Sequence, residues 1–400
     1  MRSLVAILLL VVALVLGFVT GFSLFFRLAY VLVILLALSR VWSLINLRGI
    51  EVIREAHLLR AQVGQVVEEK FEVRNTTPIG KPWVEVRDYS DLPEHHASLA
   101  FSLGTRQTRR WQVKTICQQR GKFTLGPIAI SSSDPFGFFQ GHRLMKDTKT
   151  LLVYPSTVEL PGFEIPGGEL PGEGRLHDRT HQMTPVASRI RDYQPGDAYN
   201  RIHWPSSART GKLQVKEFEL DPSSDVWILL DMHQEAQAGQ GQDSTEEYAV
   251  TIAASLAKHF LGASRSLGLI AFGEHHEVVP SDRGGRQQLK IFESLAVVRA
   301  TGHIPLGEII AAESFRFGRN STVIVVTPST KEDWVQGLQQ LVNRGVRGVA
   351  VVLDPTTFGG PDSPILAVGL LAAAGIPSYV IRRGESIRET LLFGKGGMGR

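Results

Sequence analysis

The sequence is almost free of cysteine, and its charge is weak and scattered. Of its 400 residues one is a cysteine, Cys117, and the formal net charge at pH 7 is +4. One cysteine excludes an internal disulfide bond and any zinc site built from several cysteines. Lysines and arginines form no cluster with interleaved aromatic residues, which is the pattern of a nucleic-acid-binding face. The sequence therefore predicts no nucleic-acid partner.

The N-terminal 47 residues are almost entirely apolar. The run "LVAILLLVVALVLGFVTGFSLFF" begins at Leu4, and "LAYVLVILLALSRVWSLINL" begins at Leu28. Together they exceed the roughly 20 apolar residues that one membrane span needs. Gly21, Ser23 and Arg27 interrupt the apolar pattern between them. We therefore predict a transmembrane hairpin over residues 1–47, with two spans at about 4–20 and 26–46.

Basic residues flank both ends of this predicted hairpin. Arg2 precedes the first span, and Arg40, Arg48 and Arg54 follow or end the second. Arginines near the membrane favour the cytoplasmic side, where anionic lipids attract them. We expect a multi-pass protein whose large C-terminal part is cytoplasmic. A signal peptide is disfavoured because no small-residue cleavage site follows, whereas a single tilted span would place the rest of the protein outside.

Residues 48–155 alternate polar and apolar side chains in short runs such as "QVVEEKFEVRN" and "RRWQVKTICQ". Such runs, separated by turn residues about every ten positions, predict an antiparallel β-sandwich of two sheets. The motif "DPFGFF" at 134–139 carries three phenylalanines. We expect these side chains to close the core of the sandwich, and the alternative is a patch that binds a partner.

Residues 156–187 are rich in proline and glycine and have no apolar period. This composition predicts a linker. His177 and His181 lie four residues apart beside Asp178, but glycine and proline around them do not favour the helix that would align two metal ligands. We interpret them as solvated loop residues.

Residues 188–220, called the hallmark segment below, combine several arginines and aspartates with a His-Trp pair. "QPGD" fits a turn, and the following residues predict a helix that begins near Asn200, ends at Gly211 and leads into a strand. We interpret the segment as an ordered binding interface formed by Arg191, Asp192, Tyr193, Gly196, Asp197, Arg201, His203, Trp204 and Arg209.

The hallmark segment also admits an enzymatic interpretation. His203 could act as a general base oriented by Asp197, with Ser206 or Ser207 as the nucleophile of a hydrolase. Neither serine lies on a strand-to-helix elbow, and no Gly-rich loop that cradles phosphate precedes a helix here. We therefore expect no catalytic residues and favour the interface.

Residues 221–387 change rhythm to short apolar strands that alternate with helices. "DVWILLDM", "SLGLIAFG", "STVIVVTP", "GVAVVLDP" and "PSYVIRR" read as buried strands. Continuous apolar strands separated by helices predict a doubly wound α/β fold with a parallel sheet covered on both faces. Residues 388–400 are predicted to be a flexible tail.

Nearly the whole chain resembles the domain of unknown function 58 family. The resemblance is carried by "RDYQPGDAYNRIHWPSSARTGKL", by the earlier "RGKFTLGP", "DPFGFF" and "LLVYP", and by the apolar hairpin before them. It implies a protein of the bacterial inner membrane that acts with a MoxR-type AAA+ ATPase. The implied role is that of a non-enzymatic adaptor in chaperone-like assembly or activation of other proteins.

The α/β region also resembles a von Willebrand factor type A domain, a fold that often binds a divalent ion at the end of its sheet. The resemblance implies five ligand positions, which here hold Asp231, His233, Glu235, Ile304 and Pro328. Only the first keeps the oxygen ligand that Mg²⁺ requires. We therefore expect a degenerate metal site and no cofactor, with a zinc-like site of Asp231, His233 and Glu235 as the less favoured alternative.

Overall fold

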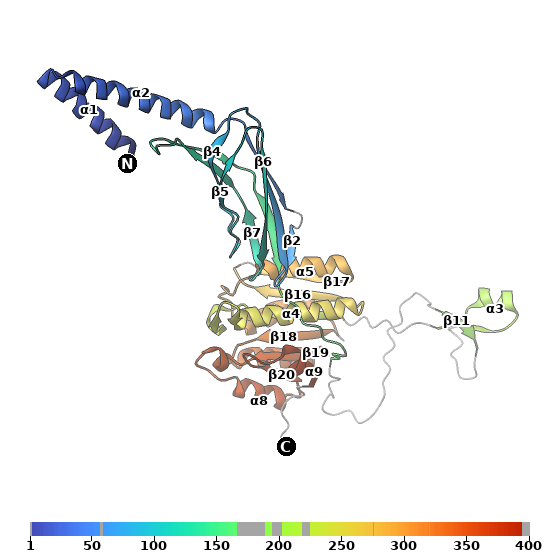
Figure 1. Ribbon diagram of the computed structural model, residues 1–400. Helices are drawn as coiled ribbons and strands as arrows, with labels where there is room; N and C mark the ends of the chain where they lie inside the picture. The colour runs from blue at the N-terminus through green and yellow to red at the C-terminus, as the bar shows by residue number, and fades with distance from the viewer. Residues whose placement is uncertain are drawn as a thin grey trace. The chain divides into compact units, whose positions relative to one another are not determined.

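The computed structural model describes residues 2–56, 59–165, 189–193, 202–217, 225–274, 276–319 and 321–393. The chain divides into two compact units (Figure 1). The first contains residues 1–156 and 295–297, and the second contains residues 157–294 and 298–400.

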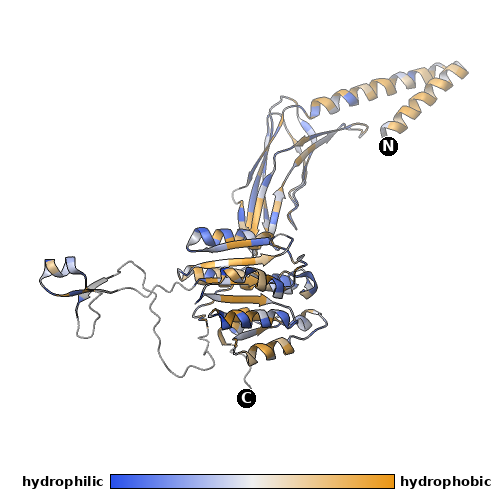
Figure 2. Ribbon diagram, turned by 180° about the vertical axis from the view of Figure 1, so that it is seen from behind, coloured by the Kyte–Doolittle hydropathy of each residue, from blue (hydrophilic) through white to orange (hydrophobic). Residues whose placement is uncertain are grey.

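The N-terminal residues of the first unit form two apolar helices, α1 (Arg2–Thr20) and α2 (Ser23–Asn46). They break at Gly21, whose φ of +65° suits a glycine, as the sequence predicted. Figure 2 shows both helices coloured as hydrophobic along almost their whole length. By length and composition, Ser3–Thr20 and Ser23–Asn46 could each cross a membrane.

The rest of the first unit consists of β-strands in three sheets rather than the predicted two. Their strand orders are β1-β3-β6, β2-β10-β7 and β5-β4-β8-β9. β2 runs parallel to β10, so the pairing is not purely antiparallel. The strands are β1 (Ile50–Ala56), β2 (Arg60–Gln62), β3 (Val66–Asn75), β4 (Lys81–Asp88), β5 (Leu99–Leu103), β6 (Thr108–Ile116), β7 (Gly121–Leu125), β8 (Ile128–Ser133), β9 (Gln140–Met145) and β10 (Lys149–Tyr154).

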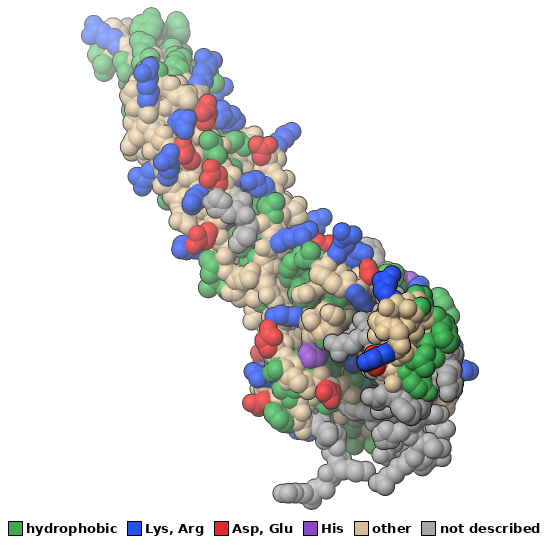
Figure 3. All heavy atoms as spheres, turned by 90° about the vertical axis from the view of Figure 1, so that its right-hand side faces the viewer, with side chains coloured by type: hydrophobic (Ala, Val, Ile, Leu, Met, Phe, Trp, Pro, Cys, Tyr) green, Lys and Arg blue, Asp and Glu red, His purple; other side chains and the backbone are tan. Residues whose placement is uncertain are grey.

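Alternation along β3 separates a buried face from a charged one. Phe71 and Val73 are buried in an apolar cluster, whereas Glu72 pairs with Arg74 and Arg110 at the surface. In the face drawn in Figure 3, acidic side chains lie among the basic ones. The alternation is the one that the sequence predicted for strands with one buried face.

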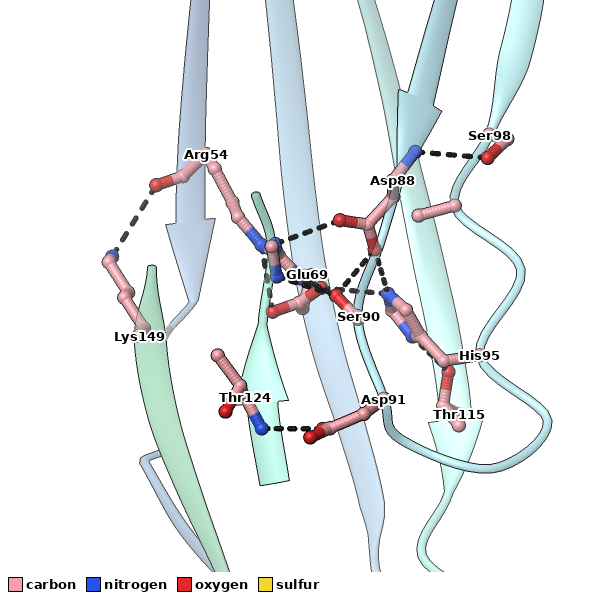
Figure 4. A network of polar contacts seen from close by, with 12 residues as sticks. Arg54, Glu69, Asp88, Ser90, Asp91, His95, Ser98, Thr115, Thr124 and Lys149 are labelled. Atoms are coloured by element: carbon pink, nitrogen blue, oxygen red, sulfur yellow. Dashed lines mark hydrogen bonds and ion pairs between the residues drawn. The ribbon is translucent and has the colours of Figure 1, made fainter. Parts of the chain in front are cut away.

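The buried face of the first unit also contains a cluster of four charged side chains (Figure 4). Arg54 of β1 contacts Glu69 of β3 at 2.7 Å and Asp88 of β4 at 3.1 Å. Nε2 of His95, in the loop between β4 and β5, lies 3.1 Å from a carboxylate oxygen of each acid. The four side chains are at most 8% exposed. Two positive and two negative groups therefore balance inside the protein.

The prediction that "DPFGFF" closes the core is wrong. The motif forms the turn between β8 and β9, where Phe136 is 54% exposed and Phe138 and Phe139 are only partly buried. The core is instead filled by the alternating residues of the strands, such as Ile128 and Ile130 of β8.

The predicted linker at 156–187 is ordered at its start. Leu160 and Phe163 are buried against helix α4 (Thr245–Gly262) of the second unit. The Val158 N–H donates to the Ser255 hydroxyl at 2.8 Å, and the Phe163 carbonyl lies 2.9 Å from Nε2 of His259. Apolar leucine and phenylalanine among the prolines explain why this stretch packs. Residues 166–187, with His177, Asp178 and His181, lie outside the described residues.

The second unit contains a six-stranded sheet in the order β17-β16-β13-β18-β19-β20. Numbered along the unit, this order is 3-2-1-4-5-6, that of a doubly wound α/β fold. Five strands are parallel, as predicted, and the edge strand β17, which the sequence analysis missed, is antiparallel. The strands are β13 (Val226–Leu230), β16 (Leu267–Phe272), β17 (His276–Asp282), β18 (Thr322–Thr327), β19 (Arg347–Leu353) and β20 (Ser378–Ile381).

Helices cover this sheet. Trp227 and Leu229 of β13 pack in one apolar cluster with α6 (Leu306–Glu313), α7 (Asp333–Asn343) and α8 (Ile365–Ala373). Every residue of β13 and β18 is buried, so both faces of the central strands are covered. Helix α5 (Gly285–Val297) follows β17. The predicted tail begins too early, because α9 (Ile387–Phe393) is helical and buries Leu391.

Candidate functional site

The described part of the hallmark segment forms a small hairpin that carries a helix. Strand β11 (Arg189–Asp192) pairs antiparallel with β12 (Gln214–Glu217), and Arg191 lies opposite Val215. Helix α3 (Trp204–Thr210) lies between them in the chain. The strand at β12 confirms the prediction, whereas β11 was not foreseen because its four residues are too few to show a period.

Both ends of α3 are capped by local hydrogen bonds. His203 is the N-cap residue, and its Nδ1 accepts from the Ser206 N–H at 3.3 Å and lies 2.7 Å from the Ser206 hydroxyl. The Ser207 hydroxyl donates to the His203 carbonyl at 3.0 Å. Gly211 ends the helix with φ of +69°, as predicted. The helix begins at Trp204 rather than near Asn200, because His203 supplies the cap.

These caps leave an aromatic side chain on the surface. Trp204, the first residue of α3, is 65% exposed, and Leu213 beside β12 is 44% exposed. Arg209 lies in the last turn of α3, where a cation suits the negative end of the helix dipole. Tryptophan is usually buried at least in part, so an exposed one on a capped helix is suited to contact another molecule.

The remaining hallmark residues are placed in part. The Tyr193 N–H donates to the Leu213 carbonyl at 2.9 Å, and Asp192 accepts from the Gln214 side chain at 3.4 Å. Both residues therefore brace the hairpin. Gly196, Asp197 and Arg201 lie outside the described residues, and the side chain of Arg191 is not described.

A second candidate site lies where β13 and β18 end. Asp231, directly after β13, is completely buried. One carboxylate oxygen accepts from the Thr327 hydroxyl at 2.5 Å, and the other accepts from the His233 N–H at 3.0 Å. Burial raises the pKa of Asp231, although both hydrogen bonds act in the opposite direction. Both oxygens are thus held by donors of the protein itself.

The other predicted ligand positions do not converge on Asp231. Glu235 is exposed and lies 3.8 Å from Lys331. The Ile304 side chain packs against the apolar cluster of the sheet, and Pro328 follows β18. His233 is buried and its backbone bridges to Gly302. Among the described residues, no three His, Cys, Asp or Glu side chains are grouped so that they could hold a metal ion.

The sequence analysis missed the residues that hold Asp231. In the parallel register, Leu230 lies opposite Val326, so the next residues, Asp231 and Thr327, are neighbours. This register could have revealed the pair. Gln237 adds a hydrogen bond from its side chain to the Asp231 carbonyl at 2.9 Å, and it in turn accepts from Thr245 at 2.7 Å. The loop after β13 is therefore fixed by a chain of polar contacts.

The loops after β13, β18 and β19 surround a cavity of about 240 Å³. It is lined by His233, Glu235, Ser329, Lys331 and Asp362, together with several prolines. In doubly wound folds, ligands bind outside the carboxyl ends of the strands, where these loops lie. The rim carries charges of both signs, so it suits a polar surface of mixed charge.

The contacts of Asp231 predict how a variant will respond to pH and to divalent cations. The raised pKa means that Asp231 contributes stability at low pH which is lost as the pH rises through its folded-state pKa. The melting temperature of Asp231→Asn, relative to that of the wild type, is therefore expected to increase with pH. Because Thr327 and His233 occupy the carboxylate, Mg²⁺ or Mn²⁺ is expected to shift the wild-type melting temperature by less than about 1 °C.

Differential scanning calorimetry between pH 5 and 8, with and without ~5 mM Mg²⁺ or Mn²⁺, measures both effects. Asp362→Asn, which removes a carboxylate from the rim of the same cavity, is the matched control. A cation-dependent rise in melting temperature that Asp231→Asn abolishes and Asp362→Asn retains would contradict this account.

These features define a protein with two apolar N-terminal helices, a β-rich unit and a doubly wound α/β unit. Residues 189–361 match the family described as "Protein of unknown function DUF58". The chain is 25% identical over 222 residues to the uncharacterized protein YeaD of Bacillus subtilis, covering 54% of this chain and 52% of YeaD. It is 28% identical over 183 residues to the uncharacterized protein Rv1480 of Mycobacterium tuberculosis, covering 44% and 57%. The chain thus spans little more than half the length of these relatives.

Similarity to solved structures is weak. The protein BatB from Bacteroides thetaiotaomicron aligns with 42% of this chain and 94% of its own at 16% identity and a TM-score of 0.32. A CARDB domain from Pyrococcus furiosus aligns with 26% of this chain and 91% of its own at 18% identity and a TM-score of 0.20. Both scores lie below 0.5, so neither similarity defines the fold.

Proposed function

We propose that this protein is a membrane-anchored, non-enzymatic adaptor that binds a MoxR-type AAA+ ATPase and assists the assembly or activation of other proteins. The observation that carries the proposal is Trp204, 65% exposed on a helix whose two ends are capped. His203, Ser206 and Ser207 are engaged in those caps. An exposed tryptophan on a capped helix that also carries Arg209 has the composition of an interface hot spot. The identity of the partner rests on the family resemblance.

We further infer that the α/β unit is a von Willebrand factor A-like domain that works without its ion. The strand order with one antiparallel edge supports the fold. The hydrogen bond from Thr327 to Asp231 supports the loss of the ion, because the hydroxyl takes an oxygen that a cation would need. The cavity between the strand-end loops is then a second contact surface for proteins.

We place the protein in the bacterial inner membrane, with α1 and α2 as its two spans and with the β-strands of the first unit and the whole second unit in the cytoplasm. Arg40 and Arg48 at the end of α2 support this topology under the positive-inside rule. The alternative is an extracytoplasmic envelope protein with one span. A C-terminal reporter that is active only outside the membrane distinguishes them, and its activity would overturn the cytoplasmic placement.

Affinity capture tests the adaptor function. The full-length tagged chain is solubilised in detergent and captured with ATP, with ADP and without nucleotide. We expect an AAA+ ATPase to be recovered in amounts that depend on nucleotide, because such ATPases change conformation with their nucleotide state. Recovery of no AAA+ ATPase under any of the three conditions would contradict the proposal.

The hydrolase alternative rests on one observation, the 2.7 Å contact between His203 Nδ1 and the Ser206 hydroxyl. The same nitrogen accepts from the Ser206 N–H, which is the geometry of a helix cap. If the pair were catalytic, His203→Ala, Ser206→Ala and Asp197→Ala would each abolish turnover while partner binding persisted. We expect no turnover for these variants to lose.

A further inference from the structure

The turn between β8 and β9, residues 134–139, presents phenylalanine side chains outside the core. Phe136 is 54% exposed, and its ring stacks on that of Phe138 with 5.8 Å between centroids. Phe138 and Phe139 are partly exposed as well. Exposed aromatic side chains gathered on one turn mark a contact with an apolar partner.

This turn lies beside the last turns of α2. Asn46 of α2 donates to the Ser132 hydroxyl of β8, and a Cβ on Gly141 of β9 would clash with Leu47 and come within 3.5 Å of the Ser43 hydroxyl. The guanidinium of Arg40 lies 5.7 Å from the centre of the Phe139 ring. The residues of β8 and β9 farther from the turn contact the C-terminal end of α2, and Phe139 in the turn contacts Arg40, which is closer to the apolar middle of the helix.

The buried lysine of β4 fixes the end of α2 in the same place. Lys81 is fully buried, and its ammonium donates to the Ile45 carbonyl at 2.9 Å. A cation at the C-terminal carbonyls of a helix is favoured by the helix dipole. Together with the contact between Asn46 and Ser132, this bond fastens the strands to α2.

The turn lies beside the part of α2 near Arg40, and this part has the side chains typical of a membrane helix where it meets the lipid headgroups. Arg40 and Trp42 are in the last two turns of the apolar helix, and the Trp42 side chain is 39% exposed. Arginine and tryptophan concentrate at this boundary, because both combine an apolar body with a polar group. Trp83 of β4, whose carbonyl contacts Asn46, adds an aromatic side chain that is 49% exposed.

Three backbone N–H groups of the turn already have hydrogen-bond acceptors within the protein, which suits surroundings with little water. The buried carboxylate of Asp134 accepts from the N–H groups of Phe136 at 3.0 Å and Phe139 at 2.6 Å. The Gly137 N–H donates to the Asp134 carbonyl at 3.1 Å. Unpaired backbone groups are costly in lipid, so a turn whose amides are already bonded enters it more readily.

We propose that the turn at 134–139 inserts Phe136 and Phe138 into the boundary between headgroups and acyl chains, beside α2. Its partner is the phospholipid bilayer, and Arg40 supplies a positive charge for the lipid phosphates. The chain then holds the bilayer at three places, α1, α2 and this turn, and the strands cannot turn freely about the end of α2. The proposal rests on the anchoring of α1 and α2 in the membrane, and it is independent of the ATPase partner.

Depth-dependent fluorescence quenching in liposomes tests the insertion. An environment-sensitive fluorophore is attached to the full chain at Phe136→Cys, and in a matched control at Ile116→Cys. Ile116 is 56% exposed, at the end of β6 opposite the end that lies near α2. Cys117 is buried and burial raises the pKa of its thiol, so the introduced thiols react first. The liposomes contain phosphatidylglycerol and a quencher attached near the top of the acyl chain, and iodide is the aqueous quencher.

We expect both proteins to float with the liposomes, and lipid quenching to be at least about threefold stronger at position 136 than at 116, since only the former lies at the interface. Asp134→Ala, which frees two amides of the turn, is expected to reduce that quenching without changing flotation. Flotation with equal, weak lipid quenching and full iodide quenching at both positions would overturn the insertion alone. Protection of position 136 from both quenchers would also overturn it, because a protein would then cover the turn. Failure to float would overturn the anchoring and the insertion together.

Discussion

Replacement of Glu69 by alanine is expected to lower the free energy of unfolding of the first unit by about 3–5 kcal/mol, because the change leaves buried positive charge uncompensated. Glu69 is fully buried and accepts from both Nη2 and Nε of Arg54, at 2.7 and 3.3 Å. It also lies 3.1 Å from His95. Without it, Arg54 and His95 share the single charge of Asp88 (Figure 4).

The same cluster predicts the pH dependence of stability. Burial acts to lower the pKa of His95, but the contacts with Asp88 and Glu69 outweigh it and raise the pKa to about 9. Its contribution to stability is therefore complete below the ordinary value of 6.5 and is lost as the pH rises through about 9. Burial acts to raise the pKa values of Glu69 and Asp88, but their partners lower them, so their contributions are lost at acid pH.

Urea denaturation followed by circular dichroism at several pH values measures these effects. His95→Gln is expected to remove the loss of stability near pH 9. Glu72→Ala, on the exposed face of the same strand, is the control and is expected to cost less than about 1 kcal/mol. A Glu69→Ala variant as stable as Glu72→Ala would show that the four charges are not coupled as the structure indicates.

Replacement of Trp204 by alanine is expected to weaken binding of the captured ATPase by about 30-fold or more, equivalent to at least about 2 kcal/mol. Trp204 is exposed, and α3 keeps its caps in the variant because His203 and Gly211 are unchanged. The loss of affinity would therefore report the missing contact rather than an unfolded helix. Surface plasmon resonance with the full chain in nanodiscs measures the dissociation constant.

Phe315→Ala is the matched control for this variant. Phe315 is 71% exposed in the second unit, away from the hallmark segment in sequence. We expect it to bind the ATPase with wild-type affinity. Equal losses for both variants would indicate a general effect of surface aromatic residues, and no loss for Trp204→Ala would remove this residue from the interface.

Long, strongly patterned segments were predictable from the sequence. The two apolar helices and the parallel strands were predicted from uninterrupted apolar runs, because such runs are compatible with few other structures. The edge strand β17 was missed because its residues are mostly half-exposed and polar at both ends, as in "HEVVPSD". Phe136 was predicted to be buried and is exposed, whereas Leu160 was assigned to a linker and is buried. Composition alone does not show whether an apolar side chain packs in the core or lies at the surface.

Sites formed by residues far apart in the sequence were harder to predict from the sequence. The four buried charges come from β1, β3, β4 and a loop. Alternation along β3 puts Glu69 on the face of Phe71 and Val73, but no local pattern reveals the partners from other strands that neutralise its charge. Thr327 lies 96 residues from Asp231 and becomes its partner only through the register of β13 and β18. The caps of α3 are local, and accordingly the helix and its end at Gly211 were predicted within a few residues.

We propose that the protein acts through the contacts of its hallmark segment. Photo-crosslinking in intact membranes tests this proposal, with a photoreactive amino acid at position 204 and, as a control, at position 315. We expect a covalent adduct with an AAA+ ATPase from position 204 and none from position 315. An absence of protein adducts at position 204, in membranes where the ATPase is present, would contradict it.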